Sequence, residues 1–160
     1  MSYFRFSPIT RDIVFRGFCH HDKKWHYGLF LPRGFFLGVG GHAFEPLTDE
    51  ALIYCIEDGR ERLIPVDTTS IGQYIGLKDR NGVKIFEGDI TRSFDPILEE
   101  LCGRAGVVEF GETGCSDCGS ICGYKLSEPD GLYSPSEFVV IGNVFENRDL
   151  LATSSNNSSR

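Results

Sequence analysis

Short runs of apolar residues, separated by polar or glycine-containing turns, recur along most of the chain. Residues 12–18 (DIVFRGF) and 25–31 (WHYGLFL) are rich in β-branched and aromatic residues and flank the polar segment CHHDKK. This pattern is typical of a β-hairpin with a polar tip. Residues 51–57 (ALIYCIE) turn through DGRE into RLIPV, which predicts a second hairpin. We therefore expect the first half of the chain to consist of paired strands.

Residues 72–90 (GQYIGLKDRNGVKIFEGDI) carry the most specific pattern in the chain. Asp79 can accept hydrogen bonds from its own turn, and Asn81 and Gly82 tolerate positive φ, so the segment predicts a tight hairpin. We expect three side chains to pack across or beside the turn: Tyr74, Ile85 and Phe86. Gly88 then permits a sharp bend into a strand in which Ile90 points inward.

Two ligand-binding loops are the alternatives for this stretch, and the spacing excludes both. An EF-hand loop that starts at Asp79 would place Gly82 at position 4 rather than at position 6. A phosphate-binding P-loop requires GxxxxGK followed by Ser or Thr, and the string GLKDRNG lacks that ending.

The second half of the chain predicts further strands and one short helix. Residues 95–101 (DPILEEL) have Asp95 as a candidate N-cap and proline at the first helical position. Residues 106–110 (GVVEF) and 137–145 (EFVVIGNVF) are typical of buried strands, and residues 146–151 of a final capped turn. The glycine- and phenylalanine-dense segment 32–44 predicts irregular strands or loop.

These elements predict a mainly β protein with one or two short helices. We expect one unit over residues 1–151, with an N-terminal β-hairpin region at 11–74 and an SH3-like small barrel at 75–151. The barrel is inferred by analogy, because glycine-punctuated bends suit strands that curl tightly. Residues 152–160 lack apolar side chains to pack beyond an alanine and are predicted to form a disordered tail.

Composition and charge narrow the classes of function. The 160 residues carry a net charge of -7, which disfavours broad binding to nucleic acid phosphates. The charge is uneven: residues 1–40 hold six Lys and Arg against two Asp and Glu, whereas the rest is strongly acidic. We expect the two regions to pack against each other or against a second copy. With no apolar run of membrane-spanning length and no signal-peptide pattern, we expect a cytoplasmic protein without a membrane partner.

The cysteines raise the first question of chemistry. Cys115, Cys118 and Cys122 form a close cluster, and Cys102 lies thirteen residues earlier. Structural zinc, a redox CxxC pair and free thiols in an exposed insertion are the three interpretations. Zinc sites usually use two close pairs of ligands rather than a cluster of three, so free thiols are favoured and no cofactor is predicted.

A second candidate group surrounds the tip of the first hairpin: Cys19, His20, His21, Asp22 and His26. Adjacent side chains on a strand point to opposite faces, so His20 and His21 do not easily share one ion. A polar hairpin tip is therefore favoured over a metal site. Two carboxylate pairs offer acid and base groups, Glu87 with Asp89 and Glu99 with Glu100, but a strand start and a solvated helix face explain them as well. No GxSxG motif occurs, and we predict no catalytic, cofactor or metal site.

Four blocks in order resemble the YopX family of phage, prophage and mobile-element proteins. RDIVFRGF and KKWHYG within residues 11–28 are similar to the family's opening "REIKFRG…WVYG", and residues 64–90 are similar to its hallmark segment. GVVEFGE at 106–112 and VVIGNVFENRDLL at 139–151 match the later blocks, the last resembling "VIGNIYENPELL". The chain departs from the pattern at 32–44 and at the cysteine cluster.

The resemblance implies a compact β-rich accessory protein, encoded by a phage or integrated element and working in a bacterial cytoplasm. It implies no activity and no functional residue. We expect a non-enzymatic protein-interaction module whose contact is supplied by exposed aromatic side chains: Trp25, Tyr27, Phe35 and Phe36. The alternatives are a nucleic-acid-associated small barrel and a metal-binding or redox protein that uses Cys115, Cys118 and Cys122.

Overall fold

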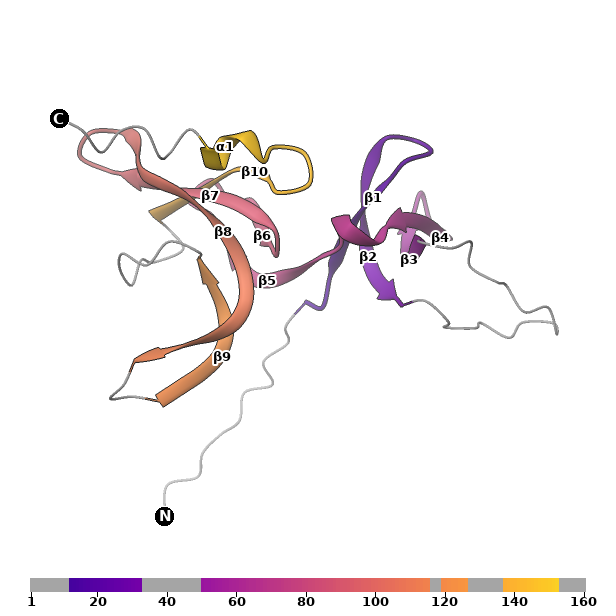
Figure 1. Ribbon diagram of the computed structural model, residues 1–160. Helices are drawn as coiled ribbons and strands as arrows, with labels where there is room; N and C mark the ends of the chain where they lie inside the picture. The colour runs from indigo at the N-terminus through magenta and orange to yellow at the C-terminus, as the bar shows by residue number, and fades with distance from the viewer. Residues whose placement is uncertain (1–11, 33–49, 116–118, 127–136, 153–160) are drawn as a thin grey trace, which may run out of the picture.

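The computed structural model describes residues 12–32, 50–115, 119–126 and 137–152, and within them the chain is mainly β, as predicted (Figure 1). The elements are β1 (Phe15–Cys19), β2 (Lys24–Leu31), β3 (Glu50–Glu57), β4 (Arg60–Asp67), the 3-10 turn η1 (Thr68–Ser70), β5 (Gly72–Lys78), β6 (Lys84–Phe86), β7 (Asp89–Asp95), β8 (Glu100–Cys115), β9 (Gly119–Leu126), β10 (Phe138–Asn143) and α1 (Asp149–Ala152). No helix of this described part is long and apolar enough to cross a membrane.

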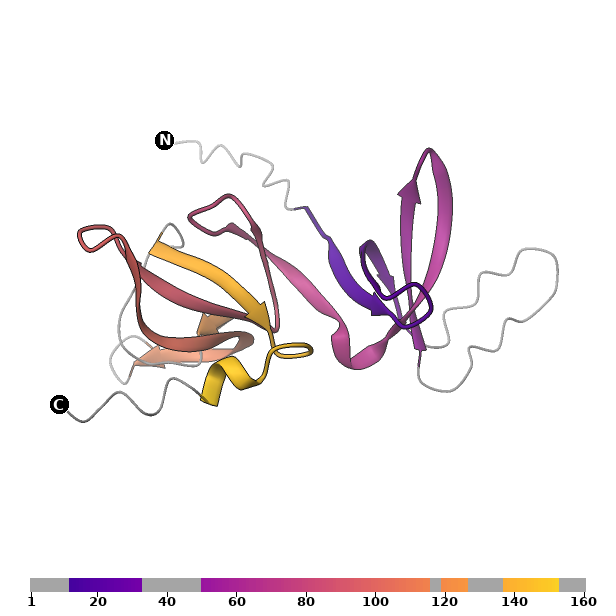
Figure 2. The ribbon, with the colours of Figure 1, turned by 90° about the horizontal axis from the view of Figure 1, so that it is seen from above.

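The strands form two antiparallel sheets. The first has the order β4-β3-β2-β1-β5-β6 and the second the order β10-β7-β8-β9. The predicted hairpins β1–β2 and β3–β4 are confirmed, with Cys19 opposite Lys24 and Glu57 opposite Arg60 at their tips. Figure 2 shows β5 running from the group β1–β4 toward the second sheet. The chain passes from the first sheet to the second between Phe86 and Asp89. The predicted boundary between the N-terminal region and the barrel, between residues 74 and 75, instead lies within β5.

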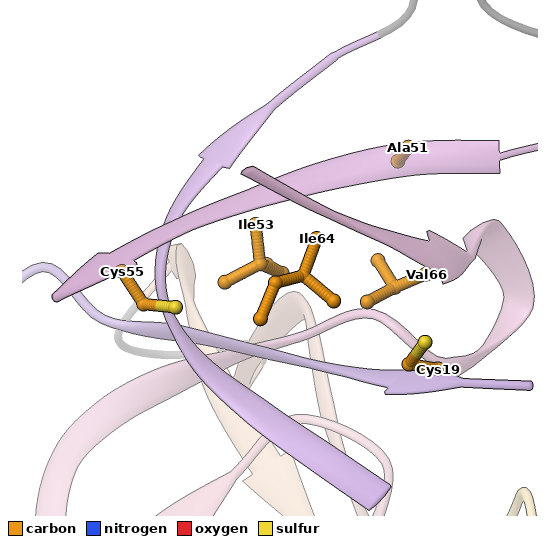
Figure 3. Close-up of a cluster of buried hydrophobic side chains, with 6 residues drawn as sticks. All are labelled: Cys19, Ala51, Ile53, Cys55, Ile64 and Val66. Carbon is orange, nitrogen blue, oxygen red and sulfur yellow. The ribbon is translucent and has the colours of Figure 1, made fainter. Parts of the chain in front are cut away.

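The inner faces of β1, β3 and β4 enclose a small apolar core. Its buried members are Cys19, Ala51, Ile53, Cys55, Ile64 and Val66 (Figure 3). A Cβ atom on Gly17 would lie 2.6 Å from a Val66 methyl carbon, so glycine lets β1 approach β4. The sheet is therefore rolled, and alternate residues of each strand face either this core or the outside.

The hairpin of β5 and β6 forms as predicted. Asp79 Oδ1 accepts from the backbone N–H groups of Asn81 and Val83, both at 2.8 Å, and Gly82 has φ of +80°. Asn81 does not share the positive φ, because the turn needs that conformation at Gly82 alone. Tyr74 packs on Phe86 with ring centroids 5.6 Å apart.

The predicted barrel is not closed in the described residues, although the strands expected for it are present. The second sheet ends at β10, and the β5–β6 turn reaches β10 through single hydrogen bonds rather than through a strand ladder. Arg80 N donates to Phe138 O, and Val140 N donates to Asp79 Oδ2, each at 3.0 Å. The bend before β7 matches the prediction, with Gly88 at φ of +79° and Ile90 fully buried.

The helix predicted over residues 95–101 is wrong. Asp95 accepts from Ile97 N and Leu98 N, as an N-cap would, but the chain turns back at Glu99, which has φ of +54°. Ile97 and Leu98 are exposed, so no neighbouring element covers the apolar side chains that a short helix here would need to bury. The segment is the turn that joins β7 to β8.

The chain end predicted as a capped turn is held by Asn143. Its side-chain Oδ1 accepts from the backbone of Phe145 and Glu146, at 3.0 and 2.9 Å. Helix α1 follows and ends at Ala152, the first residue of the predicted disordered tail. The rest of that tail and nearly all of segment 32–44, with Phe35 and Phe36, lie outside the described residues.

Candidate functional site

A buried ion pair joins the two sheets. Arg16 on β1 points outward from the first sheet, and its Nη1 lies 2.5 Å from Asp89 Oδ1 on β7. Asp89 is 1% exposed and also accepts from Phe86 N at 2.7 Å. Burial raises the pKa of Asp89, although the charge of Arg16 and the Phe86 hydrogen bond act in the opposite direction. This predicted acid–base candidate is thus placed in a structural contact, and Glu87 contributes its carbonyl oxygen to Arg16 Nη2 at 3.2 Å.

Aromatic rings surround this pair. The Arg16 guanidinium lies 4.9 Å from the ring centroid of Trp25 and 5.2 Å from that of Phe86. Phe145 packs against Trp25, and Trp25 Nε1 donates to Glu146 Oε2 at 2.9 Å. Trp25, expected as an exposed contact residue, is therefore half-buried between the two sheets.

A cleft of about 300 Å³ opens beside the ion pair. It is lined by Val14, Arg16, Tyr27, Val83, Lys84, Phe86, Asp89 and Val140. Arg16 and Asp89 already neutralise each other there, and the remaining lining is mostly apolar. The cleft thus presents one lysine charge and a mainly apolar wall.

A second polar group gathers around His26 at the tip of the first hairpin. His26 Nε2 lies 2.9 Å from Asp22 Oδ2, and His26 Nδ1 lies 2.9 Å from Glu57 Oε1. The imidazole is buried, as are the thiols of Cys19 and Cys55 at its two sides. Donor atoms of Cys19, Asp22 and His26 lie within 4.8 Å of one another, as do those of His26, Cys55 and Glu57. The five residues form what we call the His26 cluster.

Hydrogen bonding and charge shift the pKa values in this cluster. The hydrogen bond with His26 lowers the pKa of Glu57. Burial acts to raise the pKa of Asp22, but its hydrogen bond and charge interaction with His26 outweigh burial and lower it. Burial and neighbouring Glu57 raise the pKa of the Cys55 thiol.

The structure separates the remaining predicted metal-ligand candidates from this cluster. His20 Nε2 lies 2.8 Å from Asp67 Oδ2, outside the His26 cluster, and His21 is exposed. Cys102 lies near the start of β8 opposite Ser93, whereas Cys115 is the last residue of that strand. The register therefore gives no support to a four-thiolate site that includes Cys102. The side chains of Cys115, Cys118 and Cys122 fall outside the described residues.

The outer face of β2, β3 and β4 carries exposed apolar side chains. Leu29, Tyr54 and Leu63 stand opposite one another on the three strands, so their side chains form one row across the sheet. Leu29 is 50% exposed and Leu63 44%; on the same face Tyr27 is 52% and Ile56 67% exposed. Tyr27 thus fulfils the expectation of an exposed aromatic. We call these five residues the apolar outer face.

Comparison with known families identifies the lineage. The family model described as YopX protein matches residues 44–152. The chain belongs to the YopX family. The match contains the blocks at 64–90, 106–112 and 139–151, whereas the block at 11–28 lies before it. The resemblance of the sequence to this family is confirmed.

Among solved structures, the crystal structure of protein EF1440 from Enterococcus faecalis is similar to this YopX protein. It is 22% identical, the match covers 87% of this chain and 97% of that chain, and the TM-score is 0.44. No curated protein matches the sequence.

Two parts of these sites are not evident from the sequence of this YopX protein. Arg16 and Asp89 are 73 positions apart, and the sequence around neither residue contains a pattern that predicts their ion pair. Cys55 and Glu57 are predicted only as strand residues. Their spacing of two places both on one face, which is a usable signal, but only the pairing of β2 with β3 brings that face to His26.

Proposed function

We propose that this YopX protein is a non-enzymatic protein-interaction module, encoded by a phage or another mobile element as an accessory protein of the bacterial cytoplasm. The observation that supports it best is the apolar outer face. Four of its side chains are 44 to 67% exposed, and they lie on one side of the first sheet, on strands β2, β3 and β4. Isolated exposed apolar residues are ordinary, but an aligned group of this kind is typical of a contact surface.

The chemistry of the face defines the partner that fits it. Tyr54 and Tyr27 combine a rigid apolar ring with a hydroxyl group, as is common at protein interfaces. Arg60 and Glu61 at the start of the edge strand β4 are exposed and place both signs of charge at one end of the face. A protein with an apolar patch and a mixed polar rim matches this surface, and a second copy of the chain is one such partner.

The test compares two variants of the full chain. Ile56→Lys/Leu63→Lys places two charges on the apolar outer face. Ile97→Lys changes a residue that is 87% exposed in the β7–β8 turn, away from this face, and serves as the matched control. We expect concentration-dependent association in light scattering, or a stoichiometric complex isolated from host cells, that is lost in the double variant and retained in the control.

Two results would contradict the proposal. If the protein stays monomeric at all concentrations and forms no stoichiometric complex, the apolar outer face is not a contact surface. A complex that forms equally well with the double variant uses another surface. Circular dichroism and a melting curve of each variant establish that the fold is retained, which is expected because both substituted side chains already contact solvent.

A further inference from the structure

We propose that the tip of the β1–β2 hairpin binds a zinc ion through Cys19 Sγ, Asp22 carboxylate and His26 Nε2. This inference does not depend on the proposed protein-interaction function. It rests on one side of the His26 cluster, on the shape of the hairpin tip and on the partner of the second imidazole nitrogen.

The hairpin tip brings the three donors to one place. Lys23 N donates to Cys19 O at 3.0 Å, Lys24 N donates to Asp22 Oδ1 at 3.2 Å, and Lys23 has φ of +60°. The three ligand atoms lie within 4.8 Å of one another. Neighbouring ligand atoms around tetrahedral zinc are roughly 3.3 to 3.8 Å apart, given bonds of about 2.0 to 2.3 Å. On binding, the Asp22–His26 contact, now 2.9 Å, therefore opens slightly, and Cys19 Sγ, within 4.8 Å of both partner atoms, adjusts to the ion.

The opposite side of His26 has the arrangement that zinc-binding histidines usually show. A ligating imidazole normally donates its second N–H group to a carboxylate, which fixes the ring orientation and makes the first nitrogen a better ligand. His26 Nδ1 lies 2.9 Å from Glu57 Oε1. Glu57 thus acts as a positioning residue that leaves Nε2 directed at Asp22.

A nearby cation decides between the two sides of the cluster. Cys55 and Glu57 offer an alternative set of donors with His26 Nδ1. Arg62 Nη1, however, lies 3.7 Å from Glu57 Oε2, so a positive charge already occupies that side and would repel a second cation. Within the described part of the chain, the ion pair that Asp22 forms is the one with His26. The Asp22 side is therefore the better site.

The donor set and its surroundings specify the ion and the proton balance. One sulfur, one imidazole nitrogen and one carboxylate oxygen form a set that zinc accepts, with a water molecule as fourth ligand. The Asp22 side chain is 43% exposed, which gives the ion and that water access. The ion binds the Cys19 thiolate and the Nε2 lone pair, so the thiol proton leaves to solvent as the bond to sulfur forms, and Nδ1 keeps its proton toward Glu57.

The experiment uses the full chain, stripped of metal with a chelator and titrated with Co²⁺, which reports thiolate ligation through a charge-transfer absorption band. We expect one equivalent of Co²⁺ with this band, displacement by one equivalent of Zn²⁺, and proton release on binding as the thiol becomes a thiolate. Cys19→Ser and His26→Gln should remove the band. Glu57→Gln should weaken Zn²⁺ binding by about 10- to 100-fold, as is usual for loss of a carboxylate behind a ligating histidine.

Three controls separate this site from the other thiols and from misfolding. Cys115→Ser/Cys118→Ser/Cys122→Ser should keep the band, and so should His20→Gln. Asp22→Asn changes an exposed turn residue, so it should weaken binding while circular dichroism stays unchanged. The proposal is overturned if the wild-type chain shows no thiolate band, if the band survives in Cys19→Ser, or if it disappears in Cys55→Ser or in the triple variant while the fold is retained.

Discussion

At the scale of single residues, Gly82 shows how one backbone angle defines a turn. Its φ is +80°, and a Cβ atom built there would meet no heavy atom within 4 Å. Any penalty for a side chain at this position therefore comes from backbone conformation and not from a clash. The same turn uses Asp79 to satisfy two backbone N–H groups, so conformation and hydrogen bonding select the same structure.

Gly82→Val should lower the free energy of unfolding by about 1 kcal/mol or more, because a β-branched residue resists positive φ. Gly82→Asn should cost clearly less, since asparagine tolerates this region of conformational space. Urea denaturation of the two variants and the wild-type chain measures the difference. Equal stability of the Gly82→Val and Gly82→Asn variants would show that φ at this position is not what limits substitution.

At the scale of elements, sequence predicted best what depends on near neighbours. The three hairpins were predictable because alternation and turn residues act over a few positions. The wrong helix at 95–101 had a correct local signal, the capping side chain of Asp95, but its apolar residues have no packing partner to stabilise a helix. Closure of the barrel depends on hydrogen-bonded pairing between strands that are distant in sequence. No local sequence pattern indicates whether that pairing forms.

The candidate site follows the same rule. Cys19, Asp22 and His26 come from one hairpin, and the sequence pattern groups all three with His20 and His21, which the fold places elsewhere. Cys55 and Glu57 come from β3, and the pairing of Leu29 with Tyr54 is what brings them to the cluster. Sequence therefore supplied the local members of the His26 cluster and missed those added by tertiary structure.

The contact between the β5–β6 hairpin and β10 should depend strongly on Asp79. This buried carboxylate accepts from Asn81 N, Val83 N and Val140 N. Asp79→Ala leaves these N–H groups without their partner and should lower the free energy of unfolding by about 3 kcal/mol, since hydrogen bonds to charged groups contribute about 1.5 to 3 kcal/mol each and are not additive.

Asp79→Asn is the matched variant for this prediction. It keeps one acceptor oxygen for the turn but presents either an amide N–H₂ group or a weaker acceptor to Val140 N, so an intermediate loss is expected. Hydrogen exchange of the Val140 amide, measured by NMR, should accelerate in both variants. Unchanged protection of that amide would show that Asp79 does not connect the hairpin to β10.

At the scale of the whole molecule, the outward side of the first sheet has two uses. Around Arg16 and Trp25 it is covered by the second sheet and by the turn after β10, as the contacts with Asp89 and Phe145 show. Farther along β2 and on β3 and β4 it is exposed and forms the apolar outer face. In Figure 2 the first sheet extends away from the second beyond β1 and β2. The same sheet surface thus connects the two halves and leaves a region that can contact another protein.

The connection between the halves should show non-additive energetics. Arg16→Met leaves Asp89 buried without its cation and should lower the free energy of unfolding by about 3 to 5 kcal/mol, the usual effect of breaking a buried pair. Adding Asp89→Asn removes the uncompensated charge and keeps an acceptor for Phe86 N, so the double variant should recover part of the loss. Lys84→Met, at an exposed pair with Asp12, should change stability by less than about 1 kcal/mol. Denaturation curves of the wild-type chain, Arg16→Met, Asp89→Asn and the double variant measure this non-additivity. If the losses of the two single variants added up in the double variant, Arg16 and Asp89 would stabilise the molecule independently.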